Sequence, residues 1–192
     1  MRSVARQRRA YRLDALPNQH RYPNRLRRNF QAQQPNQKWV TDVTYVQTSQ
    51  GTLYLSVIKD LFDGFIVAYQ TSASNSLDLV LNTLQLALSR QRVSAGLALH
   101  SDQGFQYSSQ SYFLLARQHQ IQPSMSRRAN CWDNAVIENF FSHLKAEALR
   151  RMKLESLEQA KEAIDDYIDF YNYHRIQLKT KLTPFELRCQ SL

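Results

Sequence analysis

Three carboxylates stand in segments whose patterns predict ordered structure, and together they could perform one chemical task. Asp42 lies in the β-branched, apolar run 38–47, Asp102 follows the apolar run 96–100, and Glu138 lies near the start of a helix-like segment. Carboxylate oxygens are the hard ligands that Mg²⁺ prefers, and two such ions about 3.5–4 Å apart can stabilise the attacking and leaving oxygens of a phosphoryl transfer. Three acids that converge in the fold would suit metal-assisted chemistry on a phosphodiester.

Each acid also has a simpler interpretation. Asp42 could be exposed on an edge strand, Asp102 could serve only the Asp-Gln-Gly turn, and Glu138 could be a solvated helix carboxylate. The neighbours of Glu138 favour the chemical interpretation. Asn134 is four residues earlier and Lys145 seven residues later, so the three side chains share one face of a helix.

The elements that must position these acids follow from apolar periodicity and turn residues. Three strands are predicted at 38–47, 52–59 and 65–71, and the short turns between them favour an antiparallel meander. We then expect a helix from Ser76 to about 90, a strand at 96–100, a helix at 109–119 and a strand at 121–125. Two more helices are expected, at 134–152 and from Ser156 to about 174, and Ser156 and Gln159 predict a capping box for the second of them. A last helical turn is expected at Thr183-Pro184. This order predicts an α/β fold in which a mixed sheet is flanked by helices.

The positive charge is concentrated at the N-terminus. The net charge is +9, and residues 1–30 hold nine arginines and one acid, whereas the rest of the chain is nearly neutral. An arginine-rich arm suits a phosphate backbone, because each neutralised phosphate releases counterions, although a solubilising tail would look the same. Three prolines predict an extended linker over 14–37. We therefore divide the chain into a basic arm and linker (1–37), a catalytic core (38–175) and a C-terminal tail (176–192).

Composition excludes several other classes of protein. Nine Phe, ten Tyr and two Trp exclude wholesale disorder, and the two cysteines, Cys131 and Cys189, make neither a disulfide framework nor a zinc site by their spacing. No apolar run approaches the roughly 20 residues of a membrane span, and no apolar segment follows the basic start as it would in a secretory signal. We expect a cytoplasmic protein with reduced thiols.

Several motifs carry a family resemblance. TDVTY at 41–45, HSDQG at 100–104 and SMSRRANCWDNAVIENFF at 124–141 resemble the catalytic part of bacterial insertion-sequence transposases, of the type that is encoded across two reading frames and is similar to retroviral integrases. The first two acids have 59 residues between them and the last two have 35, with Lys145 seven positions further on, as in the Asp-Asp-35-Glu signature with its basic residue. The segments YIDFYNYHR at 167–175 and LTPFELR at 182–188 resemble the end of that family.

The resemblance implies a fold, a chemistry and a set of site residues. It implies a ribonuclease-H-like fold and a polynucleotidyl transferase in which Asp42, Asp102 and Glu138 hold two Mg²⁺ or Mn²⁺ ions. Water or a DNA 3′-hydroxyl would attack a phosphodiester at the end of the element, and strand transfer would follow. Asn130, Trp132, Asp133 and Asn134 would shape the site, and His100 and Gly104 would shape the turn that holds Asp102. The expected DNA contacts are Lys145, Arg127, Arg128, Asn130, Arg25, Arg27 and Arg28.

The resemblance also implies partners, and some features depart from it. We expect a homo-oligomer on DNA, associated with the bacterial nucleoid. Gln103 stands where the family often has Arg, and Gln177 lies where it often has His. Residues 1–37 contain no pair of helices that could form a helix-turn-helix, and His20 has no nearby Cys for an integrase-type zinc module. The chain is therefore expected to be truncated or to need a helix-turn-helix subunit from the upstream frame.

Two other functions stay open from the sequence. One is a nuclease of the same fold that cuts DNA without joining it. The other is a non-autonomous fragment that binds DNA and regulates the full-length transposase. The three intact acids favour an enzyme, whereas the absent DNA-reading modules favour the fragment.

Overall fold

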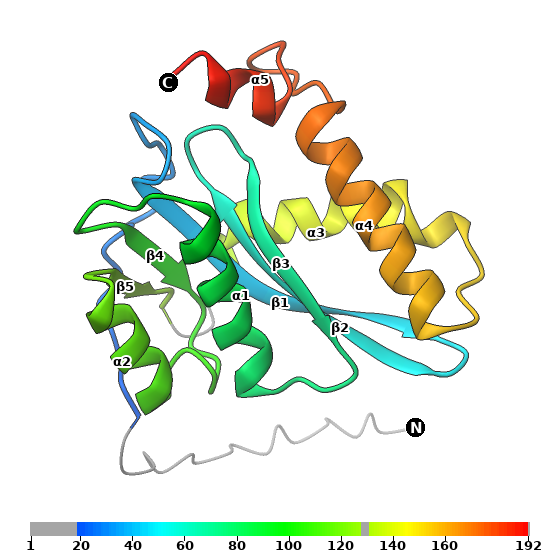
Figure 1. The fold of residues 1–192 in the computed structure, drawn as a ribbon, viewed down its shortest axis with the longest axis horizontal. Helices are drawn as coiled ribbons and strands as arrows, with labels where there is room; N and C mark the ends of the chain where they lie inside the picture. The colour runs from blue at the N-terminus through cyan, green and yellow to red at the C-terminus, as the bar shows by residue number, and fades with distance from the viewer. Residues whose placement is uncertain (1–18, 128–130, 192) are drawn as a thin grey trace, which may run out of the picture.

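The fold is built on a five-stranded mixed sheet. The computed structural model describes residues 19–127 and 131–191. The strands are β1 (Lys38–Thr48), β2 (Gly51–Asp60), β3 (Ile66–Ser72), β4 (Ala98–Ser101) and β5 (Gln122–Met125), in the order β3-β2-β1-β4-β5 (Figure 1). The first three form the predicted antiparallel meander, and β4 and β5 are parallel to β1.

The helices begin and end close to the predicted positions. They are α1 (Leu77–Arg90), α2 (Gln110–Gln118), α3 (Ala135–Glu147), α4 (Leu157–Tyr173) and α5 (Pro184–Cys189), with 3₁₀ turns at Cys131–Asp133 and Leu149–Arg151. The helix expected over 134–152 ends at Glu147, where the chain tightens into the second 3₁₀ turn and buries Leu149. No helix in the described ranges is long and apolar enough to cross a membrane.

The predicted helix caps are partly rearranged. Ser76 and Ser156 accept the expected bonds from the backbone N–H groups of Leu79 and Gln159. The Gln159 side chain, however, accepts from the N–H of Glu155 and not from that of Ser156, so this capping box is incomplete. The reciprocal arrangement occurs in α5, where Thr183 and Glu186 each accept from the backbone of the other.

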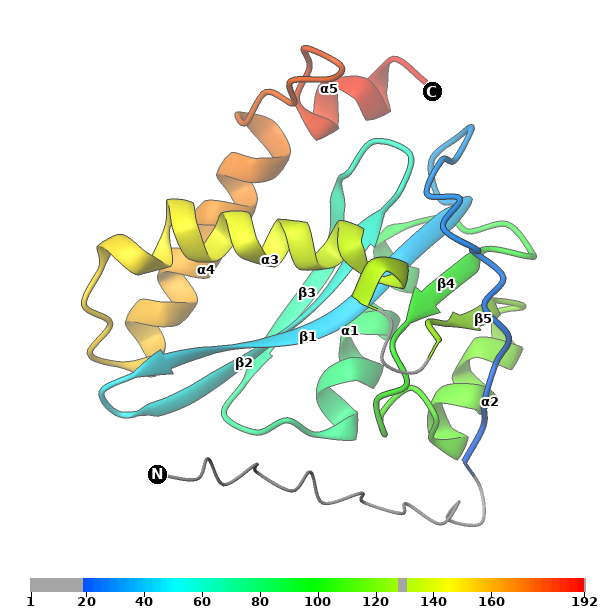
Figure 2. The same ribbon diagram turned by 180° about the vertical axis from the view of Figure 1, so that it is seen from behind.

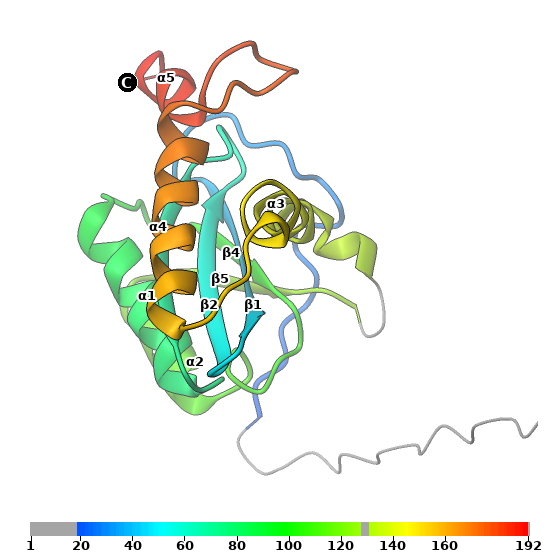
Figure 3. The same cartoon turned by 90° about the vertical axis from the view of Figure 1, so that its right-hand side faces the viewer.

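Apolar side chains cover both faces of the sheet. Neighbouring strand residues point to opposite faces, and Val40 and Trp39 accordingly belong to two different core clusters. The cluster on the face of Val40 contains the inward side chains of α3 and α4, and the cluster on the face of Trp39 contains those of α1 and α2. Figure 2 shows α3 crossing its face of the sheet, and Figure 3 shows the sheet edge-on between α1 and α3.

The described part of the predicted linker packs against the core. Leu26 is buried in the same cluster as α3, and its backbone N–H and that of Arg25 point at the hydroxyl of Ser124 on β5. The His20 N–H donates to the Ser108 carbonyl at 2.8 Å, and its ring stacks on Phe113. Residues 19–37 contain no helix or strand, turn at 25–28 and 33–37, and pack as part of the folded unit.

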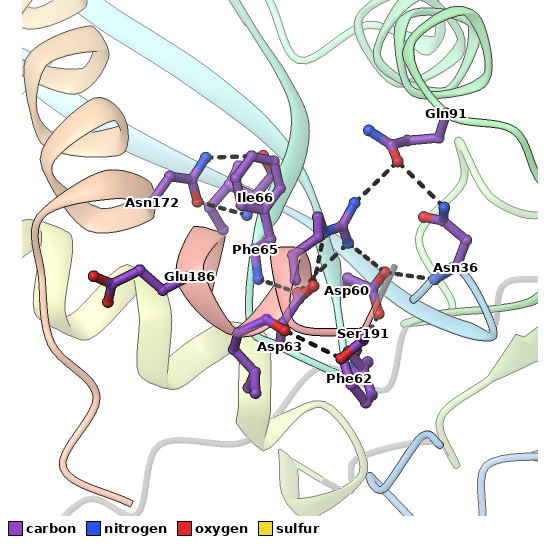
Figure 4. Close-up of polar contacts among 12 residues, drawn as sticks. Asn36, Asp60, Phe62, Asp63, Phe65, Ile66, Gln91, Asn172, Glu186 and Ser191 are labelled. Carbon is purple, nitrogen blue, oxygen red and sulfur yellow. Dashed lines mark hydrogen bonds and ion pairs between the residues drawn. The ribbon is translucent and has the colours of Figure 1, made fainter. Parts of the chain in front are cut away.

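The C-terminal tail is fixed to the core by a buried ion-pair cluster. Arg188 of α5 donates to Asp60 at 2.6 Å and to Asp63 at 2.7 Å, and both carboxylates are fully buried at the β2–β3 turn (Figure 4). Asp60 also accepts from the Asn36 N–H, and Gln91 accepts from Arg188. The cluster therefore joins the C-terminal helix to the segment before β1 and to the end of α1.

Candidate active site

The sheet brings the first two acids together. In the parallel pair of β1 and β4, Val40 lies opposite His100. Asp42 is two residues further along β1, and Asp102 directly follows Ser101, the last residue of β4, so both acids lie near the carboxyl end of β4. Neighbouring strands are about 4.8 Å apart, which places the two backbones side by side at this point.

Asp42 is held in a half-buried position by two hydrogen bonds. Its Oδ1 accepts from the Val43 N–H at 2.8 Å, and its Oδ2 accepts from the Asn134 side chain at 3.1 Å. Burial and, less strongly, the negative charges of Asp102 and Glu138 together raise the pKa of Asp42 to about 7. The charges of both other acids thus act on Asp42.

Asp102 shapes the turn after β4 and depends on a glycine. Its Oδ1 accepts from the Gly104 N–H at 2.8 Å. A Cβ on residue 104 would lie only 2.9 Å from that same oxygen, so only glycine fits without displacing the carboxylate. Gln103, where the resembling family often has Arg, donates to the Ser126 carbonyl at 3.0 Å and so ties this turn to the end of β5.

The third acid is carried by α3. Ile137, Phe140 and Leu144 are buried against the sheet, which leaves Glu138 exposed on the side of the helix near Asp42. Asn134 occupies the N-cap position, but its side chain makes no cap bond and donates to Asp42 instead. A residue type typical of a helix cap is thus diverted to the acidic site.

Lys145 lies two helical turns beyond Glu138, about 10 Å along the axis at 1.5 Å per residue. Its Nζ is 5.2 Å from the ring centre of Tyr45, and the two residues line a pocket of about 270 Å³ together with Arg150. Burial lowers the pKa of Lys145, and the charge of Arg150 lowers it further. The predicted basic residue therefore lies on the same helix as Glu138, beside Tyr45 of β1.

A second basic group lies on the other side of the site. Asn24, Arg27, Arg28 and Arg127 line an open pocket of about 500 Å³. The buried carboxylate of Asp133 accepts from Arg28 and from Arg127, each at 3.0 Å. Three of the predicted DNA contacts are thus gathered here from segments about a hundred residues apart. The predicted contacts Arg128 and Asn130 lie outside the described residues.

His100 is part of the support of the site. It is fully buried two residues before Asp102, and its Nδ1 lies 2.8 Å from the Ser124 hydroxyl on β5. Burial lowers its pKa, which favours the neutral imidazole. The same hydroxyl accepts from the Arg25 N–H, so β4, β5 and the N-terminal segment meet at Ser124.

The donor set suits a hard divalent cation. The site offers three carboxylates, and their mutual repulsion would be relieved by positive charge. The Oδ1 atom of Asn134 is also buried and finds no donor in the described ranges. No group of three or more His, Cys, Asp and Glu side chains, among the residues that the structure describes, is close enough to form a preassembled metal site.

Sequence comparison places the chain among known recombination proteins. The family described as integrase core domain matches residues 32–131, and a second family of that description matches residues 138–192. The chain is 43% identical to an uncharacterized transposase-like protein of Haemophilus influenzae over 90% of this chain and 80% of that protein. It is 42% identical to transposase InsK for insertion sequence element IS150 of Escherichia coli, over 88% of this chain and 60% of the relative. The chain thus spans about 60% of the InsK length.

Structural comparison confirms the predicted fold class. A chain of the simian T-cell lymphotropic virus intasome superposes with a TM-score of 0.73 at 16% identity, covering 90% of this chain and 60% of that one. The HTLV-2 integrase catalytic core domain, solved in complex with magnesium, superposes with a TM-score of 0.66 at 18% identity, covering 82% of this chain and 99% of that one. The fold is therefore the ribonuclease-H-like fold of retroviral integrase cores.

Proposed function

Since this chain belongs to the integrase core domain family, we propose that it is the catalytic part of a DNA transposase. It cuts a phosphodiester at the end of an insertion sequence and joins the resulting 3′ end to target DNA. The observation that carries this proposal is the placement of Asp42 on β1, Asp102 directly after the neighbouring strand β4, and Glu138 on α3, whose N-cap residue Asn134 donates to Asp42.

The proposed cofactor is a pair of divalent metal ions, Mg²⁺ or Mn²⁺. Asp42 and Asp102 on neighbouring strands and Glu138 on the covering helix would hold them. When bound, such ions polarise the phosphodiester and lower the pKa of an attacking water or hydroxyl. The protein contributes the fixed positions of the carboxylates, which Val43, Gly104 and Asn134 hold by hydrogen bonds.

The proposed DNA path passes the acids between two basic groups. Lys145 lies at one end of α3, where its ammonium acts as a point charge towards a phosphate. Arg27, Arg28 and Arg127 form the pocket on the other side, and their guanidinium groups suit phosphate oxygens. Arg25, Arg128 and Asn130 complete the proposed set of DNA contacts.

The proposed partners are DNA and other protein subunits. Strand transfer at two element ends needs two active sites, so we propose a homo-oligomer assembled on DNA. A helix-turn-helix subunit from the upstream reading frame would read the terminal repeats. The proposed location is the bacterial nucleoid.

A joining assay with labelled element-end DNA and Mn²⁺ tests this proposal. The wild-type chain, with the upstream-frame product present, is expected to give joined strands as well as nicked ends. Asp42→Asn, Asp102→Asn and Glu138→Gln should each lower both products by at least about a hundredfold, because each removes a charge that the transition state needs. Glu162→Gln and Asp166→Asn, at exposed positions of α4, are the matched controls.

The outcomes separate the competing functions. Nicks without joined strands would indicate a nuclease of the same fold. DNA binding without either product would indicate the non-autonomous fragment. Near-normal turnover in any one of the three acid variants would contradict the assignment of that acid.

A further inference from the structure

One buried carboxylate next to the acidic site is unusually well bound. The Asp133 side chain is 0% exposed. It accepts from Asn24 Nδ2 at 2.9 Å, from Arg28 Nε at 3.0 Å, and from the backbone N, Nε and Nη2 of Arg127 at 3.1, 3.0 and 3.1 Å. These bonds lower the pKa of Asp133 well below its ordinary value, the side chain of Arg127 having the largest effect. Asp133 is therefore an ionised, buried carboxylate, and we call the cluster of Asp133 with Asn24, Arg28 and Arg127 the Asp133 hub.

The hub joins three separate parts of the chain. Asn24 and Arg28 belong to the N-terminal segment, Arg127 follows β5, and Asp133 itself ends the 3₁₀ turn that leads into α3. The N-terminal segment is independently anchored, since Leu26 is 4% exposed and the Arg25 N–H is bonded to Ser124. It therefore offers Asp133 a fixed set of donors.

The residue after the hub touches the catalytic acids. Asn134 is buried, and its side chain donates to Asp42. Its backbone carbonyl accepts from the N–H groups of Ile137 and Glu138, which begin α3. The position of Asn134 thus sets both the orientation of Asp42 and the start of the helix that carries Glu138.

We infer that Asp133 is a positioning residue, through which the N-terminal segment 24–28 fixes the geometry of the acidic site. Asp133 acts through Asn134 and does not touch the reacting atoms itself. The inference rests on the proposed function in one respect, since the acids are taken to bind divalent metal. It predicts that loosening the hub weakens metal binding even where the three acids are unchanged.

The direction of the change in metal affinity distinguishes an electrostatic effect from a loss of geometry. Removal of the Arg28 charge alone would strengthen binding of a cation, because one nearby positive charge is lost. Weaker binding in Arg28→Ala can therefore come only from lost geometry. Asn24→Ala breaks a bond to the same carboxylate without any change of charge.

Arg27→Ala is the matched control. Arg27 and Arg28 are neighbours, both have a left-handed backbone (φ 46° and 62°), and both line the same pocket. Within the described ranges, the side chains that donate to Asp133 are those of Asn24, Arg28 and Arg127, so Arg27→Ala leaves these bonds intact and Arg28→Ala does not. If the pocket binds DNA, both variants lose DNA affinity, so DNA binding cannot separate them and metal binding can.

The experiment measures the thermal shift of the full chain as a function of Mn²⁺ concentration, without DNA. Arg28→Ala and Asn24→Ala are expected to raise the Mn²⁺ concentration at half-maximal shift several-fold, below the roughly 10- to 100-fold effect of removing a direct partner of a metal ligand. Arg27→Ala should keep the wild-type midpoint or lower it. Amide hydrogen exchange without metal should be faster at residues 135–138 in the first two variants only.

The outcomes are separable from those of the proposed function. Equal midpoints and exchange rates in wild type, Arg28→Ala and Asn24→Ala would overturn the positioning role, as would an equal weakening in Arg27→Ala. If wild type shows no Mn²⁺ shift, the metal part of the proposed function fails. The exchange rates at residues 135–138 then decide the positioning role alone.

Discussion

The ionised Asp42 carboxylate lowers the stability of the metal-free protein, and the same charge would favour binding of a metal ion. Its pKa in the folded chain is about 7, because burial and two neighbouring carboxylates disfavour its charge. The folded state therefore binds a proton more tightly than the unfolded state, and stability without metal falls as the pH rises from about 4 to about 7. A bound cation would remove this penalty, so the same charges that weaken the free protein favour metal binding.

Asp42→Asn should therefore stabilise the metal-free protein at pH 8, by on the order of 2 kcal/mol, and have little effect at pH 4. Urea unfolding at the two pH values measures this. Asp166→Asn, at an exposed position on α4, is the control and should behave as wild type. A decline of stability with pH that is the same in wild type and Asp42→Asn would contradict the assigned cause.

Gly104 provides a second test at the scale of one residue. A Cβ there would lie 2.9 Å from Asp102 Oδ1 and 3.0 Å from Gln106 Oε1. Gly104→Ala should displace the Asp102 carboxylate and lower joining activity by roughly tenfold or more, since small misplacements in a catalytic site cost up to about a hundredfold. Gly51→Ala is the control for backbone strain away from the site, because Gly51 has a φ of 140° and nothing lies within 4 Å of its added Cβ. Unchanged activity in Gly104→Ala would show that the Asp102 turn tolerates movement.

The sequence predicted the three acids, and the family resemblance implied that Asp133 shapes the site, but neither indicated the partners of Asp133. Asp42 interrupts a patterned segment and Asp102 follows one, whereas Glu138 is indicated by Asn134 and Lys145 on the same helix face. Asp133 belongs to a polar loop, and its partner Arg28 is 105 positions away. No local pattern signals such a pairing, because it depends on where the N-terminal segment packs against β5.

At the scale of elements, periodicity predicted the order of strands and helices, and tertiary contacts decided their ends. The helix expected to reach 152 stops at Glu147, where the Arg175 guanidinium and the Tyr167 hydroxyl bind the Glu147 carboxylate.

These bonds lower the pKa of Glu147 to about 2. Their stabilisation is present above the ordinary pKa of glutamate and is lost as the pH falls towards 2. The contacts join the ends of α3 and α4, which sequence periodicity cannot show.

The ion pairs of Arg188 hold the last helix, α5, against the core. Arg188→Ala leaves Asp60 and Asp63 buried without their cation, and burial and mutual repulsion already raise the pKa of Asp60. We expect a loss of about 3–5 kcal/mol in the free energy of unfolding. Equilibrium urea unfolding measures it, with Arg117→Ala on α2 as an exposed control. Combining Arg188→Ala with Asp60→Asn and Asp63→Asn should recover part of the loss, and no recovery would contradict the electrostatic explanation.

At the scale of the whole molecule, the boundary between arm and core differs from the one drawn at residue 37. Extended sequence with three prolines predicts a linker, and it does not distinguish a free linker from one that lies on a surface. Leu26, buried beside α3, and the bonds to Ser124 make residues 19–37 part of the folded unit. A deletion that tests the basic arm must therefore end before this segment.

Removal of residues 1–18 takes away five of the nine arginines of the first 30 residues and leaves Leu26 and the Asp133 hub in place. If those arginines contact phosphates, the slope of log affinity against log salt should become shallower by up to about 4, at about 0.9 per contact. Binding to a fixed element-end duplex at several salt concentrations measures the slope. Melting temperature should stay near that of the full chain, whereas removal of residues 1–30 should lower it, because it also removes Leu26 and Arg28. An unchanged slope in the shorter deletion would show that the DNA contacts lie on the folded unit alone.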